Sequence, residues 1–83
     1  MEIDTVRKRL LIRSWRRGTK ELDLILGKFT NNNVSKLEMT ELDVYEQLLS
    51  NDDYLIYNWL FGKEKIPKIF YNLIKQIQKS MYR

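Results

Sequence analysis

The stretch RRGTKELDLILG, residues 16–27, predicts where the chain changes direction. It places Gly18 among charged side chains and follows it at once with a leucine-rich run. Glycine adopts positive φ angles that other residues avoid, so a helix often ends beside one. The run that follows carries Leu22, Ile25, Leu26 and Phe29 at helical spacing. The stretch therefore predicts two helices that meet at a charged corner.

The same helical spacing of apolar residues continues on both sides of this stretch. One proline, three glycines and no long polar–apolar alternation argue against strands. We expect helices over about 4–17, 19–29, 38–49 and 53–61, and a last one from Pro67. The sequence TNNN, residues 30–33, is typical of a turn. The predicted fold is all-α, a compact bundle of four to five short helices forming one domain over residues 1–83.

The expected helix ends follow from capping chemistry. Asp4 or Thr5, Thr19 and Asp52 are candidate N-caps. Ser35 and Glu38 have the spacing of a capping box, although the helix start two or three residues later remains open. Gly18 and Gly62 are placed to end the first and fourth helices.

The composition argues against conventional catalysis. The chain has neither cysteine nor histidine, so it can form neither a Ser–His or Cys–His nucleophile pair nor a thiolate zinc site. Its longest apolar stretch, YLIYNWLF at residues 54–61, is too short to span a bilayer. The first ten residues, MEIDTVRKRL, lack the apolar run of a signal peptide. We expect a cytoplasmic protein that is not an enzyme and does not insert into membranes.

Charge is distributed in blocks of alternating sign. Residues 1–20 carry seven basic and two acidic side chains, residues 21–62 two basic and eight acidic, and residues 63–83 six basic and one acidic. A general nucleic-acid-binding protein more often spreads one sign over a broad surface. The blocks indicate segments that attract one another, or a partner with a mixed surface.

Arginine is concentrated near the corner. Five of the six arginines lie in residues 7–17, and Arg9, Arg13 and Arg16 share the polar side of the first predicted helix. Guanidinium groups recognise carboxylates and phosphates through two parallel hydrogen bonds. Arg17 and Glu21 flank Gly18, so we expect the corner to project both charges toward a partner. The alternative is structural, because a cation at a helix end and an acid at the next start each complement a helix dipole.

Two sequence blocks resemble one protein family. RLLIRSWRRGTKELDLILGKF, residues 9–29, resembles the signature of the succinate dehydrogenase flavinylation factors, in which R-G-x-x-E is followed by L-D-L-[LI]-L-G-x-F. ELDVYEQLLSNDDYLIYNWLFG, residues 41–62, is similar to a second pattern of that family. Together the blocks cover about half of the chain in the family's order. By this resemblance, Arg17, Gly18 and Glu21 carry the family's functional motif.

The resemblance implies a small helical assembly factor, not an enzyme. Such a factor binds the flavoprotein subunit of succinate dehydrogenase, and in bacteria also that of fumarate reductase, and promotes covalent attachment of FAD to a histidine of that subunit. The chain has no histidine and no dinucleotide fingerprint, so we expect it to act in trans and to bind no cofactor or metal tightly. We expect Arg9, Arg13, Arg16, Arg17, Gly18 and Glu21 to bind the partner, and the free protein to be a monomer.

Two alternatives stay open. The first is a small basic helical nucleic-acid-binding protein with Arg9, Arg13 and Arg16 on phosphates, against which the acidic middle block argues. The second concerns the fourth predicted helix, which is apolar nearly all round. We expect its aromatic residues to lie in the core, while an exposed contact patch is the other interpretation. These aromatic residues are Tyr54, Tyr57, Trp59 and Phe61.

Overall fold

Helices dominate the computed structural model, which describes residues 2–81. Over this range the α-helices are α1 (Ile3–Ser14), α2 (Lys20–Asn33), α3 (Met39–Leu49), α4 (Asp53–Leu60) and α5 (Tyr71–Met81), with short 3-10 helices η1 (Val34–Lys36) and η2 (Lys68–Phe70). The Cα radius of gyration is 11.8 Å, and about 12 Å is expected for a compact chain of this length. The predicted all-α bundle of four to five helices is confirmed.

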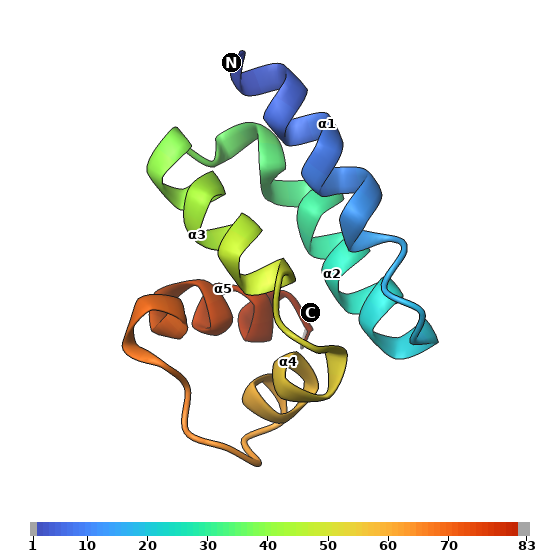
Figure 1. The fold of residues 1–83 in the computed structure, drawn as a ribbon, viewed down its shortest axis with the longest axis vertical. Helices are drawn as coiled ribbons and strands as arrows, with labels where there is room; N and C mark the ends of the chain where they lie inside the picture. The colour runs from blue at the N-terminus through green and yellow to red at the C-terminus, as the bar shows by residue number, and fades with distance from the viewer. Residues whose placement is uncertain (1, 82–83) are drawn as a thin grey trace.

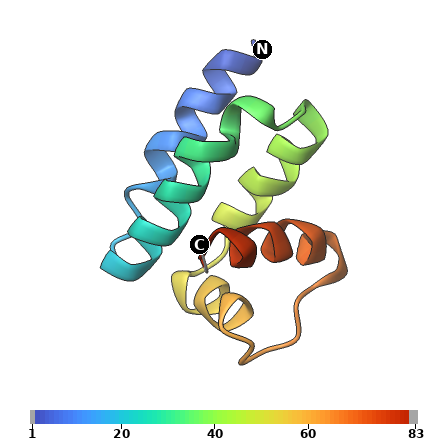
Figure 2. The same cartoon turned by 180° about the vertical axis from the view of Figure 1, so that it is seen from behind.

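The helices form two groups that share one core. Figure 1 shows α1 and α2 antiparallel and side by side, with α3 packed along α1. The helix α5 crosses the end of this group and contacts α2, α3 and α4, as the reverse view in Figure 2 also shows. The link between α1 and α2 and the N-terminal end of α4 lie at the same end of the bundle (Figure 1).

The core contains the apolar stripes that the sequence predicts. In α2, Leu22, Leu26 and Phe29 are at most 1% exposed. The predicted apolar stripes of α3 and α5 are largely buried as well. Met39 at the start of α3 is the exception, because it is 39% exposed and does not contribute to the core as predicted. The large, fully buried side chains of the other helices are Leu10, Leu42, Tyr45, Leu48, Leu49, Ile56, Leu60, Ile74 and Ile77. One continuous core therefore joins all five helices.

The turn predicted at residues 30–33 is wrong, because α2 continues to Asn33. Thr30 is buried, and its hydroxyl lies 2.7 Å from the Leu26 carbonyl and 2.7 Å from the Tyr45 hydroxyl. Asn33 donates to the Phe29 carbonyl at 2.9 Å. Buried and helix-directed hydrogen bonds therefore override the turn preference of a polar segment.

The first helix is shorter than predicted. It begins at Ile3 after Glu2 and ends at Ser14, with Trp15 as its C-cap. Gly18 does adopt a positive φ of 92°, but it lies within the link and does not end the helix. The last turn is instead tightened by the backbone N–H groups of Trp15 and Arg16, which donate to carbonyls three residues earlier.

The starts of the four other helices differ from the prediction in their capping chemistry or position. The capping box of α3 joins Glu38 and Glu41, three residues later than the first position expected. Thr19 and Asp52 occupy N-cap positions without a side-chain capping bond. Pro67 precedes η2, and α5 begins only at Tyr71, so the prediction of Pro67 as the first residue of the last helix is wrong.

The end of α4 agrees with its prediction. Gly62 has a φ of 73°, and the N–H of Lys63 donates to the Asn58 carbonyl at 2.8 Å. This is the six-residue hydrogen bond of a Schellman motif, which needs a residue with positive φ at the glycine position.

Candidate partner-binding site

The site predicted from the sequence comprises the link between α1 and α2, residues 15–19, and the first two residues of α2, Lys20 and Glu21. We call residues 15–21 the corner. Gly18 is exposed, and a Cβ built on it would meet no heavy atom within 4 Å. Asp23 in the first turn of α2 fixes the backbone, because its carboxylate accepts the N–H of Arg17 at 2.7 Å. The corner is therefore a defined turn with open space above its glycine.

Arg17 lies inside the fold, contrary to the expectation that the corner projects both charges of its motif. Its side chain is 11% exposed. The guanidinium donates to the Leu49 carbonyl at 2.6 Å and the Asn51 carbonyl at 2.9 Å. It also pairs with Asp53, with Nε 3.0 Å and Nη2 2.9 Å from Oδ1. Arg17 thus joins the corner to the link between α3 and α4.

These contacts have a clear electrostatic basis. The carbonyl of Leu49 belongs to the last turn of α3, where free carbonyl groups carry partial negative charge. A planar guanidinium satisfies several such acceptors and a carboxylate at once. Thr19 adds a longer hydrogen bond of 3.4 Å to the other carboxylate oxygen of Asp53. Asp53 therefore binds two residues of the corner.

Arg9 and Arg13 are directed at α3. Arg9 Nη2 lies 2.8 Å and Arg13 Nη1 3.5 Å from the same carboxylate oxygen of Glu46. All three side chains remain between 33% and 37% exposed. Two of the four guanidiniums predicted to bind a partner therefore already share an acid within the bundle.

Arg7 has a role similar to that of Arg17 at the other end of α1. Its Nε and Nη2 each lie 3.0 Å from a carbonyl oxygen, of Val34 and Leu37 respectively. Arg7 and Arg17 thus each supply the polar partners of a link between two other helices. The arginine concentration in α1 and the corner is in large part explained by these contacts within the fold.

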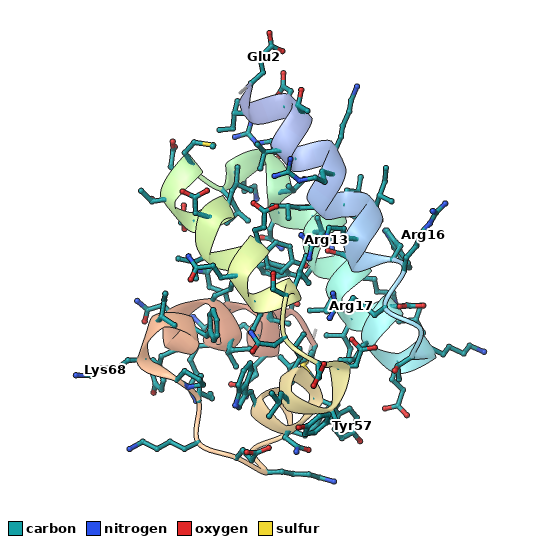
Figure 3. All side chains as sticks on the ribbon, viewed as in Figure 1. Glu2, Arg13, Arg16, Arg17, Tyr57 and Lys68 are labelled. Atoms are coloured by element: carbon teal, nitrogen blue, oxygen red, sulfur yellow. The ribbon has the colours of Figure 1, made fainter. Side chains whose placement is uncertain are left out.

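Arg16 and Glu21 are the members of the predicted set that stay exposed as charged groups. Neither has an ion pair or side-chain hydrogen bond to the residues that the structure describes. Figure 3 shows Arg16 directed away from the helices and Arg17 directed toward the link between α3 and α4. Neighbouring residues of the corner therefore have opposite environments, and the free guanidinium belongs to Arg16.

The indole of Trp15 covers Gly27 in α2. A Cβ at Gly27 would collide with this ring, reaching 2.7 Å from its Cε3 atom. The indole N–H also donates to the Asn31 side chain at 3.4 Å. Glycine within a helix normally weakens it, so the position is explained by the close approach of Trp15. The contact holds the start of the corner against α2.

A buried cluster of three hydroxyl groups lies behind the corner and joins α1, α2 and α3. The hydroxyl oxygens of Ser14, Thr30 and Tyr45 are 2.7 to 2.8 Å from one another. Burial raises the pKa of the Tyr45 phenol above its ordinary value of 10.0, and the hydroxyls of Ser14 and Thr30 and the charge of Arg17 partly oppose this rise. The cluster fixes the relative register of the three helices that carry the corner.

Sequence reasoning missed the residues that hold the corner in place. Asp23, Asp53 and Glu46 were part of an acidic block with no assigned partners. Within residues 2–81, no cluster of three or more carboxylate, imidazole or thiolate groups is arranged as a metal site. Over the same range, no helix combines the length and apolar character that crossing a membrane requires.

The geometry defines a class of protein, a small helical bundle that presents an ordered charged turn at one end. Comparison with known families specifies it further. The family model described as "Flavinator of succinate dehydrogenase" matches residues 8–81. The chain therefore belongs to this family, as the resemblance of its two sequence blocks indicated.

Individual relatives agree with this assignment. The chain is 42% identical over 69 residues to the mitochondrial succinate dehydrogenase assembly factor 2 of Dictyostelium discoideum, which covers 83% of this chain and 49% of the relative. It is 34% identical over 76 residues to the FAD assembly factor SdhE of Legionella pneumophila strain Lens, covering 92% of this chain and 96% of the relative. The chain thus spans about half of the Dictyostelium protein and nearly all of the Legionella protein.

Proposed function

We propose that this chain is an assembly factor that binds the flavoprotein subunit of succinate dehydrogenase and promotes covalent attachment of FAD to a histidine of that subunit. The observation that carries the proposal is the family match over residues 8–81. The name of the Legionella relative, FAD assembly factor, supports the same process. Fumarate reductase, whose flavoprotein subunit the family resemblance also implies, is the second partner in this proposal.

The composition supports action in trans. A chain without histidine cannot itself accept a histidyl flavin bond. It also lacks the residues from which a nucleophile with a paired base is usually built. The histidine and the flavin in this proposal both belong to the partner, and this chain contributes binding and orientation without being an enzyme.

The exposed pair at the corner is the proposed point of contact. Arg16 and Glu21 carry opposite charges on either side of Gly18, and the open space above Gly18 lets another backbone approach closely. Arg17 acts from within the fold and positions this surface. Docking of the corner would hold the partner's histidine and flavin in attack geometry, and orientation of this kind lowers a reaction barrier substantially.

The nucleic-acid alternative loses support from the same contacts. It requires Arg9, Arg13 and Arg16 together on phosphates, yet Arg9 and Arg13 both face Glu46. A carboxylate between two guanidiniums weakens their attraction for phosphate. Binding to random duplex DNA that falls steeply with added salt would favour this alternative.

Co-expression tests the proposal directly. The flavoprotein subunit of succinate dehydrogenase is expressed with and without this chain, and covalent FAD is measured by flavin fluorescence in a denaturing gel. We expect the flavin signal of the subunit to rise when the chain is present, and the two proteins to co-purify at moderate salt. An equal flavin signal with and without the chain would overturn the proposed function. Co-purification without a change in covalent flavin would show that the chain binds the subunit but does not promote FAD attachment.

A further inference from the structure

The outer face of α4 and its C-cap carry aromatic side chains that lie wholly or partly outside the core. Tyr54, Tyr57 and Phe61 follow one another at intervals of three and four residues, and we call them the aromatic stripe. Tyr54 is 63% and Phe61 38% exposed, while Tyr57 is partly buried. The inner face of α4, with Ile56 and Trp59, is buried. The expectation that all the aromatic residues of this helix lie in the core is therefore wrong for Tyr54 and Phe61.

Two of the three rings of the aromatic stripe pack against each other within the fold. The rings of Tyr57 and Phe61 are tilted against each other with centroids 4.5 Å apart. The Lys63 ammonium lies 5.4 Å from the Tyr57 ring centroid. Rings held in place lose little conformational freedom on binding, and Tyr, Phe and Arg are enriched where protein interfaces derive their affinity.

The aromatic stripe is attached to the corner by named contacts. Asp53, the first residue of α4, accepts hydrogen bonds from Arg17 at 3.0 Å and from Thr19 at 3.4 Å. Tyr54 is the next residue along the chain. Figure 3 shows Tyr57 below Arg17, on the side of the molecule to which Arg16 is directed. The start of α4 is therefore bonded to the corner, and Arg17 holds the corner and the helix that carries the aromatic stripe in fixed relation.

We propose that the aromatic stripe is the second half of the surface that binds the flavoprotein subunit, an inference that rests on the proposed function. Two exposed ions alone bind weakly, because water screens both charges. A stable and specific interface covers about 800 Å² and involves about 20–30 residues on each partner, and the corner contains far fewer residues than that. The aromatic stripe adds apolar surface beside the corner, in addition to the exposed side chains of Ile12 in α1, Trp15 in the corner and Leu24 in α2. Ile69 in η2 and Tyr71 in α5 are exposed as well. Figure 3 shows Lys68, the first residue of η2, on the other side of the molecule from Arg16 and Tyr57.

Binding measurements with matched variants test this inference. Tyr54→Ser removes the most exposed ring, Tyr54→Phe removes only its hydroxyl, and Tyr71→Ser removes a ring that is 50% exposed on α5. The labelled full-length chain is titrated with purified flavoprotein subunit, and thermal unfolding of each variant is recorded. We expect Tyr54→Ser to raise the Kd by about tenfold or more, with Tyr54→Phe and Tyr71→Ser within about twofold of the unaltered chain.

The outcomes separate this inference from the proposed function. If Tyr54→Ser binds as tightly as the unaltered chain while an Arg16→Ala, Glu21→Gln double variant binds weakly, the aromatic stripe is not an interface and the proposed function stands. If the unaltered chain does not bind the subunit, both fail. If sedimentation shows a dimer of the free chain that Tyr54→Ser dissociates, a second copy covers the aromatic stripe and the inference is overturned.

Discussion

The guanidinium of Arg17 and the carboxylate of Asp53 meet at 2.9 Å although 36 positions separate them in the sequence. This pair connects the corner with the start of α4, and Arg17 also donates hydrogen bonds to the Leu49 carbonyl at the end of α3 and the Asn51 carbonyl in the following link. The arginine of the R-G-x-x-E motif thus organises the surface, and its neighbour Arg16 presents the charge. Under the proposed function, folding and binding roles would be divided between two adjacent residues of the same type.

Arg17→Ala is expected to destabilise the fold. The substitution leaves the carbonyls of Leu49 and Asn51 and the Asp53 carboxylate without their partner, in a place where the arginine side chain is only 11% exposed. Because Asp53 stays partly solvated, we expect a loss of about 2 kcal/mol in the free energy of unfolding, near the lower range for removing one member of a buried pair. That loss would lower the Tm by about 10 °C for a chain of this size.

Arg17→Lys is the matched control for this experiment. Lysine keeps the positive charge but lacks the planar fork that reaches several acceptors, so it should restore only part of the stability. Urea unfolding followed by circular dichroism measures all three proteins. Equal stability of Arg17→Ala and the unaltered chain would show that the internal contacts of Arg17 do not support the fold.

Gly27 and Trp15 form a pair whose coupling can be measured. Alanine in place of glycine within a helix normally stabilises by about 0.5–1 kcal/mol. At Gly27 the added methyl collides with the Trp15 ring, so we expect Gly27→Ala to destabilise the chain instead. In a Trp15→Ala background the same substitution should become stabilising. A double-mutant cycle on unfolding free energies checks this change of sign, and additive effects would contradict the contact.

Tyr45→Phe is expected to lower the free energy of unfolding near neutral pH. The loss should be only about 1 kcal/mol, because Ser14 and Thr30 keep their hydrogen bonds to helix carbonyls. At high pH the difference in stability between the unaltered chain and the variant should shrink. Burial raises the pKa of Tyr45 above 10.0, so above pH 10 the unfolded state loses this proton first and stability falls with rising pH.

The phenylalanine variant lacks this ionisation, and its stability should therefore fall less steeply above pH 10. The contribution of one such group is at most about 1.4 kcal/mol per pH unit. Urea unfolding of both proteins between about pH 9 and pH 11 gives the comparison. Parallel curves over this range would show that the phenol ionises equally easily in the folded and unfolded states.

The helical class was predictable because it depends on local spacing. Leu22, Leu26 and Phe29 repeat at helical intervals, and their burial follows from that repeat. The end of α2 was not predictable in the same way. Thr30 stays helical because it bonds Ser14 and Tyr45, which are 16 and 15 residues away. Local turn preference carries no information about such partners.

The candidate site was predicted in part. A positive φ at Gly18 follows from glycine chemistry, and the structure confirms it. Which guanidinium faces outward could not be read from the sequence, because Arg16 and Arg17 are adjacent in an irregular link without helical periodicity. The partners of Arg17 lie 32 to 36 residues away. Only a three-dimensional arrangement brings them to the corner.

Arg16→Ala and Glu21→Gln are expected to reduce flavin attachment without reducing stability. Both side chains are exposed, and neither contacts another described residue through an ion pair or side-chain hydrogen bond. Surface changes of this kind usually alter the free energy of unfolding by less than about 0.5 kcal/mol. If the corner binds the flavoprotein subunit, however, the double variant should weaken the complex by about tenfold and lower the yield of covalent FAD at limiting concentration.

Lys8→Ala with Lys28→Gln provides the control for this double variant, because both lysines are exposed on α1 and α2 outside the corner. The yield is measured by flavin fluorescence of the denatured subunit, and binding by titration with the purified subunit. A raised concentration of the Arg16, Glu21 variant should restore the yield if the corner acts through affinity. If the yield of covalent FAD stays low at a saturating concentration of the variant, these charges orient the partner rather than only bind it. An unchanged yield at every concentration would exclude the corner from the interface.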